Sequence, residues 1–384
     1  MKIAMLGTKG IPATWGGIER HVEEVAVRLA AKGHDVTVYC RPYYTTTDEK
    51  LYKGVHLKKL PTIPSKSLDA IVHTFIATMH TMMEDYDIVH YHALGPGTLA
   101  ILARMAGKNA VISVHGLDWQ REKWGRQAKL FLKFGERASV LFPYYTIAVS
   151  KYLKNYLEEK YDRPVRYIAS GVVNPVFRAP DKIRQFGLGE KDYILFVARL
   201  VPEKGCHFLI DAYKKINPKL KLVIAGGSSH SDEYVDELRK HESDKIIFTD
   251  YVFGETLQEL FSNAYCYVQP STIEGLPITL LEAVSYGSCV VVSDIPPNTE
   301  IVQDAGVTFE SQNVDDLSEA LSMVIDNPIL ARELGERARE HGFAEFTFDK
   351  VADQIERLYQ EVMERGVEPI REKSDILKLY DSID

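Results

Sequence analysis

The sequence has few cysteines and no pattern of paired metal ligands. Only four of its 384 residues are cysteines, and they are scattered singly, mostly beside apolar segments. They are Cys40, Cys206, Cys266 and Cys289. This pattern argues against a disulfide framework and against a cysteine zinc site, and it is typical of reduced core residues in a cytosolic protein.

Long apolar runs are also missing. No stretch of about twenty apolar residues occurs, so we expect no transmembrane helix. The N-terminus, MKIAMLGTKG, resembles a short strand that leads into a glycine turn, and it lacks the apolar core of a signal peptide. With 45% hydrophobic and 26% charged residues, the chain is predicted to be a cytoplasmic globular protein of two or three domains.

Charge is unevenly distributed along the chain. The formal net charge is −8, yet the first 170 residues contain 24 Lys and Arg against 16 Asp and Glu, a net +8. The remaining residues contain 22 against 38, a net −16. The split indicates either that the first half faces an anionic membrane surface or a phosphate-bearing acceptor, or that it serves only solubility. We expect no nucleic-acid partner.

One stretch, residues 271–302, contains the densest set of polar signals. It follows an apolar run at 265–268 that reads as a buried strand. A helix is predicted to begin near Pro277, and the next strand is predicted at 288–292. This loop, helix and strand form a parallel α/β unit, whose ligand site lies beyond the carboxyl ends of the strands.

Two glutamates, Glu274 and Glu282, flank the predicted start of that helix. The amide groups of the helix N-terminus attract phosphate. They lie near Gly275–Ile278, where Gly275, Leu276 and Ile278 carry an N–H and Pro277 does not. Carboxylates on both sides can accept hydrogen bonds from hydroxyl groups. A ligand with a sugar on one side of a diphosphate and a ribose on the other fits this pattern, whereas the alternative is a capped helix with a solvated Glu282.

A cationic motif, the second strong signal in this half of the chain, follows the strand predicted at 193–197. Arg199 and Lys204 flank one turn at its carboxyl end, where both can reach a diphosphate. As plain surface cations near a helix start they would be disfavoured by the helix dipole. Gly226 ends the strand at 221–225 in a loop that suits close backbone approach.

The N-terminal glycines resemble a dinucleotide fingerprint at first sight. Gly16 and Gly17 lead from the first strand, at 2–6, into an amphipathic helix. The second strand, at 35–40, runs into Arg41 and supplies no acid for a ribose, which argues against an NAD enzyme. These glycines would instead let a phosphate or an acceptor approach the backbone.

Two histidines in the first half of the chain directly follow predicted strands. His92 follows a predicted strand at 87–91, and His115 and Asp118 follow one at 110–114. The triplet Asp85-Tyr86-Asp87 matches a metal-binding D-x-D pattern but precedes its strand, so we interpret it as solvated turn chemistry. We therefore expect no metal.

Residues 121–137 combine cations with aromatic residues. Six bases stand against two acids, and Trp119, Trp124, Phe131 and Phe134 lie among them. A basic amphipathic helix of this kind can lie on an anionic leaflet. The alternative, which we favour slightly, is a helix that packs its aromatic side chains on the sheet and keeps its charges in water.

Several strings resemble a known family. EGLP, LLEA and SDIP in order, with ARLVPEKG, resemble the retaining GT-B glycosyltransferases of family 4, whose E-x7-E motif binds a nucleotide-sugar donor. GTKGIPATWGGIE and HGLDWQREKWG resemble a bacterial subgroup that includes rhamnosyltransferases of cell-surface polysaccharide assembly. The string SGVVNP resembles the family's interdomain turn, but Ser170 stands where the family usually has an asparagine before the glycine. The backbone contact made by that asparagine is therefore not expected here.

The resemblance implies roles for individual residues. Arg199 and Lys204 would clamp the diphosphate, Glu274 would orient the sugar and Glu282 the ribose. Expected catalytic residues are His115, Asp118, Arg199, Lys204 and Glu274. Expected donor-binding residues are Gly16, Gly17, Arg199, Lys204, Gly226, Tyr251, Val252, Glu274, Gly275, Leu276, Pro277, Ile278 and Glu282. Expected acceptor-binding residues are Thr8, Lys9, His92 and Trp119.

The expected architecture is α/β with two Rossmann-like domains and an interdomain cleft. An acceptor domain at 1–172 is joined by a linker at 173–189 to a donor domain at 190–345. A helix at 346–366 returns to the first domain, and a charged tail follows at 367–384. The favoured reaction transfers an L-rhamnosyl unit from dTDP-L-rhamnose to a hydroxyl group of a saccharide or lipid-linked saccharide acceptor. The alternatives are a UDP-hexose, UDP-HexNAc or GDP-mannose donor, a sugar-nucleotide epimerase, and a non-catalytic sugar-nucleotide-binding protein.

Overall fold

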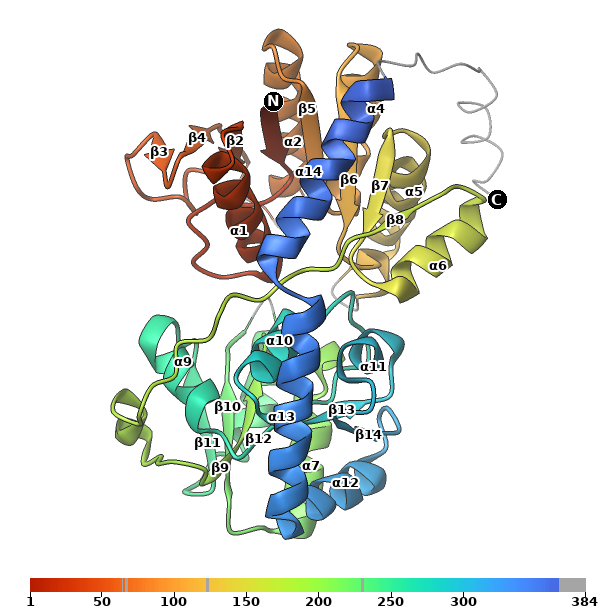
Figure 1. Cartoon of the computed structure of the whole chain (residues 1–384). Helices are drawn as coiled ribbons and strands as arrows, with labels where there is room; N and C mark the ends of the chain where they lie inside the picture. The colour runs from red at the N-terminus through yellow and green to blue at the C-terminus, as the bar shows by residue number, and fades with distance from the viewer. Residues whose placement is uncertain (64, 66–67, 122–123, 229–230, 366–384) are drawn as a thin grey trace. The chain divides into compact units, whose positions relative to one another are not determined.

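The computed structural model of the protein describes residues 1–63, 65, 68–121, 124–228 and 231–365. The expected tail at 367–384, and Lys123 of the basic stretch, lie outside the described residues. The chain divides into two units, drawn in Figure 1. Unit 1 contains residues 1–170 and the chain from Phe348 onwards, and unit 2 contains residues 171–347.

Unit 1 is built on an eight-stranded sheet in the order β3-β4-β2-β1-β5-β6-β7-β8. All neighbouring strands are parallel except β3 and β4, which form an antiparallel pair at one edge. The strands are β1 (Lys2–Leu6), β2 (Asp35–Cys40), β3 (Leu51–Tyr52), β4 (Val55–Lys59), β5 (Ile88–His92), β6 (Asn109–Val114), β7 (Tyr145–Ala148) and β8 (Arg166–Tyr167). Because β1 continues to β2 on one side and borders β5 on the other, the connections diverge above β1 and β5.

Helices cover both faces of this sheet, as a parallel sheet requires. In order they are α1 (Gly17–Ala31), α2 (Asp69–Met83), α3 (Leu94–Gly97), α4 (Ala100–Met105), η1 (Asp118–Gln120), α5 (Arg126–Leu141), α6 (Lys151–Tyr161) and α14 (Phe348–Arg365). Figure 1 shows α1 and α14 in front of the sheet. Alanines of α2, α4 and α5 share a buried cluster with Val89 and Tyr91 of β5, whereas His90, on the opposite side of that strand, contacts Tyr359 of α14.

Unit 2 has a fully parallel six-stranded sheet in the order β11-β10-β9-β12-β13-β14. The strands are β9 (Tyr193–Val197), β10 (Lys221–Ala225), β11 (Ile246–Asp250), β12 (Cys266–Gln269), β13 (Cys289–Ser293) and β14 (Val307–Phe309). The helices are η2 (Lys182–Phe186), η3 (Pro202–Lys204), α7 (Cys206–Ile216), α8 (Asp232–Arg239), α9 (Gly254–Asn263), α10 (Ile278–Ser285), α11 (Pro296–Val302), α12 (Val314–Asp326) and α13 (Pro328–Glu345). The connections diverge above β9 and β12, where such sheets bind ligands.

Two stretches contain short helices that were not predicted from the sequence. The first is α3, after β5, which tolerates Pro96 because the first-turn amides need no intrahelical acceptor. The stretch expected to be a loosely patterned linker contains η2, and the amides of Asp181 and Ile183 donate to Glu259 of α9 at 2.9 and 3.1 Å. Its ordering therefore comes from one buried carboxylate in unit 2.

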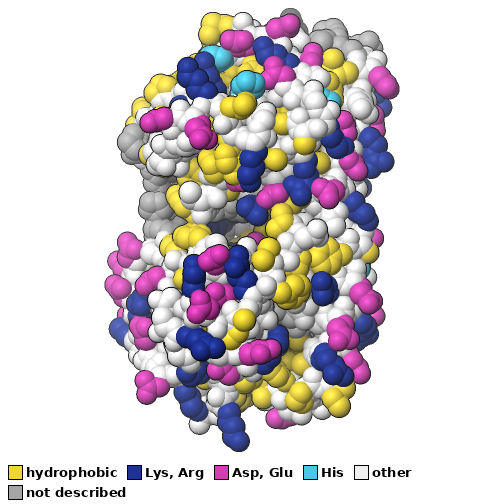
Figure 2. Space-filling model, turned by 60° about the vertical axis from the view of Figure 1, so that its left-hand side comes forward, with side chains coloured by type: hydrophobic (Ala, Val, Ile, Leu, Met, Phe, Trp, Pro, Cys, Tyr) yellow, Lys and Arg dark blue, Asp and Glu magenta, His cyan; other side chains and the backbone are white. Residues whose placement is uncertain are grey.

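Surface charge on the side seen in Figure 2 is mixed, with Lys, Arg, Asp and Glu side chains interspersed. Between α1 and α14 this mixing takes the form of ion pairs, such as Arg28 with Asp349 and Lys32 with Asp353 and Glu356. No helix in the described part of the chain has the length and apolar character needed to span a bilayer.

The attachment of α14 yields a stability prediction. Tyr359 is fully buried, and its hydroxyl lies 2.6 Å from His90 Nδ1, while His90 Nε2 lies 2.8 Å from Ser113 Oγ. Tyr359→Phe should lower the free energy of unfolding by about 1–3 kcal/mol, since it leaves a buried imidazole nitrogen without a partner. Urea denaturation measures the change.

Tyr145→Phe provides a matched control. Tyr145 is also buried, but its hydroxyl has no hydrogen-bond partner among the described residues, so its removal should change stability little. Equal losses in the two variants would contradict the role assigned to the Tyr359–His90 contact.

Candidate functional site

Two loops of unit 2 meet above the carboxyl ends of β9 and β12. The first contains Arg199 and η3, and the second runs from Pro270 to the start of α10. The Thr272 amide donates to the Glu203 carbonyl at 2.9 Å. Gly205 has φ +70°, and a Cβ there would lie 2.1 Å from the Pro270 carbonyl oxygen. Only glycine at this position lets the loops lie this close.

The contact between the loops ends in an ion pair. Lys204 Nζ lies 2.5 Å from Glu274 Oε1, and the two side chains are only 16% and 7% exposed. Gln269 Nε2 donates to the same carboxylate oxygen at 2.7 Å and to Ser271 Oγ at 2.7 Å. The structure thus brings together two residues that are 70 positions apart in the sequence, and it holds the carboxylate from two directions.

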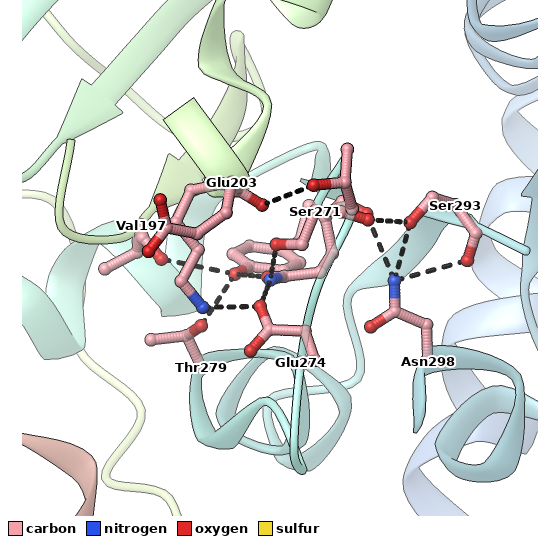
Figure 3. A network of polar contacts seen from close by, with 11 residues as sticks. Val197, Glu203, Ser271, Glu274, Thr279, Ser293 and Asn298 are labelled. Carbon is pink, nitrogen blue, oxygen red and sulfur yellow. Dashed lines mark hydrogen bonds and ion pairs between the residues drawn. The ribbon is translucent and has the colours of Figure 1, made fainter. Parts of the chain in front are cut away.

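Figure 3 shows the polar network around this pair. The Tyr267 hydroxyl donates to Gln269 Oε1 at 2.5 Å and lies 3.0 Å from Thr279 Oγ1 of α10. On the other side, Ser293 Oγ donates to the Ser271 carbonyl, and Asn298 Nδ2 donates to Ser293 Oγ at 2.9 Å. Because β12, β13, α10 and α11 all contribute, buried side chains hold the Glu274 loop together with the backbone contact from Thr272 to Glu203.

Helix α10 begins at the end of the same loop, with Pro277 preceding its first residue. Leu276 and Pro277 are buried at its start, whereas Gly275 and Ile278 are half-buried. Amides in the first turn have no intrahelical acceptor and carry the positive end of the helix dipole. Glu282 lies on the second turn and is half-buried. The Lys204 ammonium and the helix N-terminus therefore provide positive potential at one edge of the sheet.

The loops after β10 and β11 extend this edge. Gly226 has φ +148°, and a Cβ there would lie 1.7 Å from the Ala198 carbonyl oxygen, so only glycine fits. The Tyr251 hydroxyl donates to the carbonyls of Gly227 and Ser228, at 3.0 and 3.1 Å. Burial raises the pKa of Tyr251, and the positive charge of nearby Arg199 opposes that rise. Val252, beside Tyr251, is half-buried.

In unit 1, the predicted residues His92 and His115 lie together. His92 Nδ1 is 3.2 Å from His115 Nε2, and the His21 ring centroid lies 5.2 Å from that of His115. Burial, together with neighbouring His90, lowers the pKa of His115 to about 3, and burial also lowers the pKa of His92 well below its usual value. These imidazoles are neutral at physiological pH, so they can serve as hydrogen-bonding groups but carry no charge.

The other predicted residues of unit 1 occupy separate loops. Thr8 is buried, and Lys9 Nζ lies 3.2 Å from the centroid of the Trp15 ring. Gly16, with φ +106°, precedes α1, and Gly17 is its first residue. Asp118 forms an ion pair with Arg121 at 3.1 Å within the same loop.

Trp119 is anchored by a buried carboxylate. Its Nε1 donates to Glu136 Oε2 at 2.6 Å, and Lys160 Nζ and the Tyr161 hydroxyl donate to Glu136 Oε1 at 2.7 and 2.6 Å. Glu136 is fully buried. The indole N–H of Trp119 is therefore engaged inside unit 1, and the ammonium groups of Lys133 and Lys160 lie 5.0 and 5.9 Å from the centroid of its ring.

Sequence reasoning missed several residues that support these sites. Tyr267 lies in the run at 265–268 that was interpreted only as an apolar strand, and Gln269 follows that run. A glutamine directly before Pro-Ser-Thr was the available signal. His21 is buried on α1, where its Nδ1 lies 3.0 Å from Ser170 Oγ. Among the described residues, no three His, Cys, Asp or Glu side chains gather as a metal site, and Asp87 Oδ2 instead accepts the Lys2 amide at 2.7 Å.

Comparison with known families matches both halves of the chain. Residues 15–173 match the model described as Glycosyltransferase Family 4, and residues 179–341 match the model described as Glycosyl transferases group 1. Among curated proteins, the chain is 26% identical over 391 residues to the GDP-mannose-dependent alpha-(1-6)-phosphatidylinositol monomannoside mannosyltransferase of Mycobacterium tuberculosis. That alignment covers 92% of this chain and 97% of the relative.

Solved structures share the fold. Sucrose-phosphate synthase from Thermosynechococcus elongatus aligns with a TM-score of 0.82 at 22% identity, over 95% of this chain and 100% of its own. Anabaena HepE in complex with UDP-glucose aligns with a TM-score of 0.78 at 18% identity, over 94% of this chain and 100% of its own. Given two Rossmann-like sheets, the matched family models and these likenesses, the chain belongs to the family 4 glycosyltransferases of the GT-B fold.

Proposed function

We propose that the protein is a retaining, metal-independent hexosyltransferase whose donor is held mainly by unit 2. The observation that carries the proposal is the Lys204–Glu274 pair beside the N-terminus of α10, at the point where the connections of the sheet diverge. A cation and a helix N-terminus suit a diphosphate, and an adjacent carboxylate suits sugar hydroxyl groups.

The ion pair also prepares the site for its ligand. Without a donor, Glu274 holds the Lys204 ammonium in a fixed position, so the lysine keeps little rotamer freedom to lose on binding. When the donor binds, its diphosphate becomes a second acceptor for Lys204, and the Glu274 carboxylate accepts hydrogen bonds from the sugar. Gln269 keeps the carboxylate in place during this exchange of partners.

The reaction breaks the bond between the anomeric carbon and the diphosphate oxygen, and it forms a bond from the same carbon to the acceptor hydroxyl oxygen. Negative charge grows on the leaving diphosphate, where Lys204, Arg199 and the α10 amides stabilise it. The acceptor proton moves to a donor phosphate oxygen on the same face, which retains the anomeric configuration. His115 and His92, both neutral, serve as hydrogen-bonding groups for a sugar, and Asp118 remains a proposed catalytic residue.

The donor sugar is proposed on the sequence strings rather than on the site geometry. Those strings favour dTDP-L-rhamnose, while one relative named above is GDP-mannose-dependent and another was solved in complex with UDP-glucose. Turnover of these three donors with a saccharide or lipid-linked saccharide acceptor tests the proposal directly. Conversion of a donor without any acceptor would instead favour an epimerase, and binding without turnover would favour a non-catalytic protein.

The first prediction concerns the diphosphate clamp. Lys204→Ala should lower kcat/KM by about 10²-fold or more, because it removes a charge that stabilises the transition state. Lys240→Ala, which removes a surface lysine paired with Glu237, is the control and should leave kcat/KM unchanged. Near-normal kcat/KM in Lys204→Ala with intact folding would overturn the clamp assignment.

The second prediction separates the two glutamates. Glu282→Ala should weaken binding of the free nucleoside diphosphate, because its proposed partner is the ribose. Glu274→Ala should preserve nucleotide binding but reduce turnover, because its proposed partner is the sugar and its loss leaves Lys204 available to the diphosphate. Titration calorimetry measures the nucleotide affinity of both variants, and the exposed substitution Glu319→Ala is the control. Equal losses of nucleotide affinity in Glu274→Ala and Glu282→Ala would refute this division of roles.

The third prediction concerns metal. The negative charge of the leaving diphosphate is stabilised by Lys204, Arg199 and the helix N-terminus in this proposal, without a metal ion. Activity should therefore persist after dialysis against EDTA. The rate before and after dialysis is the measurement. Abolition by EDTA with recovery on adding Mg²⁺ or Mn²⁺ would show that a carboxylate site such as Asp85 with Asp87 had been wrongly set aside.

A further inference from the structure

The helices α2, α4 and α5 carry an unusual set of exposed side chains on unit 1. On their inner side, Ala77, Ala100, Ala103 and Ala138 pack in the buried cluster with the sheet. On their outer side, seven large apolar residues are exposed, and we name them the outer apolar face. They are Phe75, Met79 and Met83 of α2, Met105 of α4, and Leu130, Phe131 and Phe134 of α5.

The exposure is substantial rather than marginal. Met83, Met105 and Leu130 are 79%, 72% and 62% exposed, and the phenyl rings of Phe131 and Phe134 are 41% and 43% exposed. This corrects the interpretation favoured from the sequence, in which α5 packs its aromatic side chains on the sheet. Clustered exposed apolar side chains mark contact with another molecule or a membrane, and Leu130, Phe131 and Phe134 lie together within five residues of α5.

The three helices belong to one layer. They connect parallel strands, so all run antiparallel to the sheet, and the N-termini of α2 and α5 both lie at its carboxyl edge. Short helix α3 packs against α5: a Cβ on Gly135 would lie 2.5 Å from the Leu94 carbonyl oxygen, and one on Gly95 would lie 3.9 Å from the Phe131 ring. Phe131 of α5 therefore lies beside α3 in this layer.

The charge on α5 is of one sign. At 3.6 residues per turn, Arg126, Lys129 and Lys133 form a strip beside the strip of Leu130 and Phe134. The single carboxylate of this helix, Glu136, is buried and bonded to Trp119, Lys160 and Tyr161. Acidic residues Glu84 and Asp85 follow α2, at the opposite, amino edge of the sheet. The cations at the carboxyl edge thus have no outward carboxylate on their own helix.

We propose that the outer apolar face docks on the surface of an anionic lipid bilayer. Leu130, Phe131 and Phe134 would enter the boundary between headgroups and acyl chains, and Arg126, Lys129 and Lys133 would pair with lipid phosphates. Adjacent apolar and cationic strips without acidic residues match a lipid interface, whereas the mixed ion pairs between α1 and α14 illustrate how this chain builds protein contacts. This inference goes beyond the proposed reaction and does not depend on it.

Vesicle binding by the full chain tests the proposal without donor or acceptor. We expect sedimentation with vesicles of phosphatidylcholine and phosphatidylserine at low salt, and weaker sedimentation as salt rises, because salt screens charges near the surface. Lys129→Ala with Lys133→Ala should weaken that binding at least about tenfold. Leu130→Ser with Phe134→Ser should weaken it similarly while leaving its salt dependence in place.

A matched variant distinguishes this face from net charge. Lys50→Ala with Lys53→Ala removes the same charge from the β3–β4 edge of unit 1, and it should leave vesicle binding unchanged. Equal weakening by both pairs of substitutions would overturn the assignment to α5. So would wild-type protein that stays in the supernatant at low salt.

Self-association is the alternative outcome. If sedimentation velocity shows a dimer that Leu130→Ser with Phe134→Ser dissociates, and vesicles bind neither protein, the face is a protein interface and the membrane proposal is wrong. None of these measurements depends on turnover. The docking proposal can therefore be tested even if the protein is not a transferase, and the transferase proposal can be tested even if the protein does not bind vesicles.

Discussion

The candidate donor site depends on one contact: the loops of unit 2 that follow the adjacent parallel strands β9 and β12 touch above the strand ends, where the Thr272 amide donates to the Glu203 carbonyl, before the two connections diverge. Their contact is narrow enough that Gly205 is required, and it brings Lys204 within 2.5 Å of Glu274. Every other feature of the site, from the network under Glu274 to the direction of α10, follows from how this junction is supported.

Burying this ion pair is costly unless both partners are satisfied. Charges removed from water lose hydration that a single contact replaces poorly. Here Gln269 donates to Glu274, Tyr267 orients Gln269, and Thr279 lies against Tyr267, so the support extends from strand to helix. A site built this way is rigid before its ligand arrives, which suits a reaction that relies on fixed charges around a leaving group.

Some of this was predictable from the sequence, and the reason lies in periodicity. Strands such as β1, β2, β9 and β10 are short apolar runs bounded by polar turns, and their ranges match the predicted ones. The glutamates and cations of unit 2 were predictable because each follows a strand. The Lys204–Glu274 contact itself was not, since strand order decides which loops are neighbours and no local pattern encodes that order.

Burial of polar groups was the least predictable property. Glu136 looks like one of two acids in a basic stretch, yet it is the fully buried acceptor for four side chains, those of Trp119, Tyr156, Lys160 and Tyr161. Conversely, Phe131 and Phe134 look like core residues and are exposed. Both outcomes depend on which side of α5 faces the sheet, and the interleaving of cations and aromatic residues along this helix fits either orientation.

The placement of α14 in unit 1 has a consequence for how the protein is made. Unit 1 contains both the first 170 residues and the last described helix, so the ribosome completes unit 2 before unit 1. Domains generally fold as units during synthesis. Until α14 emerges, His90 lacks its Tyr359 partner, and the side of the sheet that α14 covers stays open. The half of the protein that is translated first is therefore the half that finishes folding last.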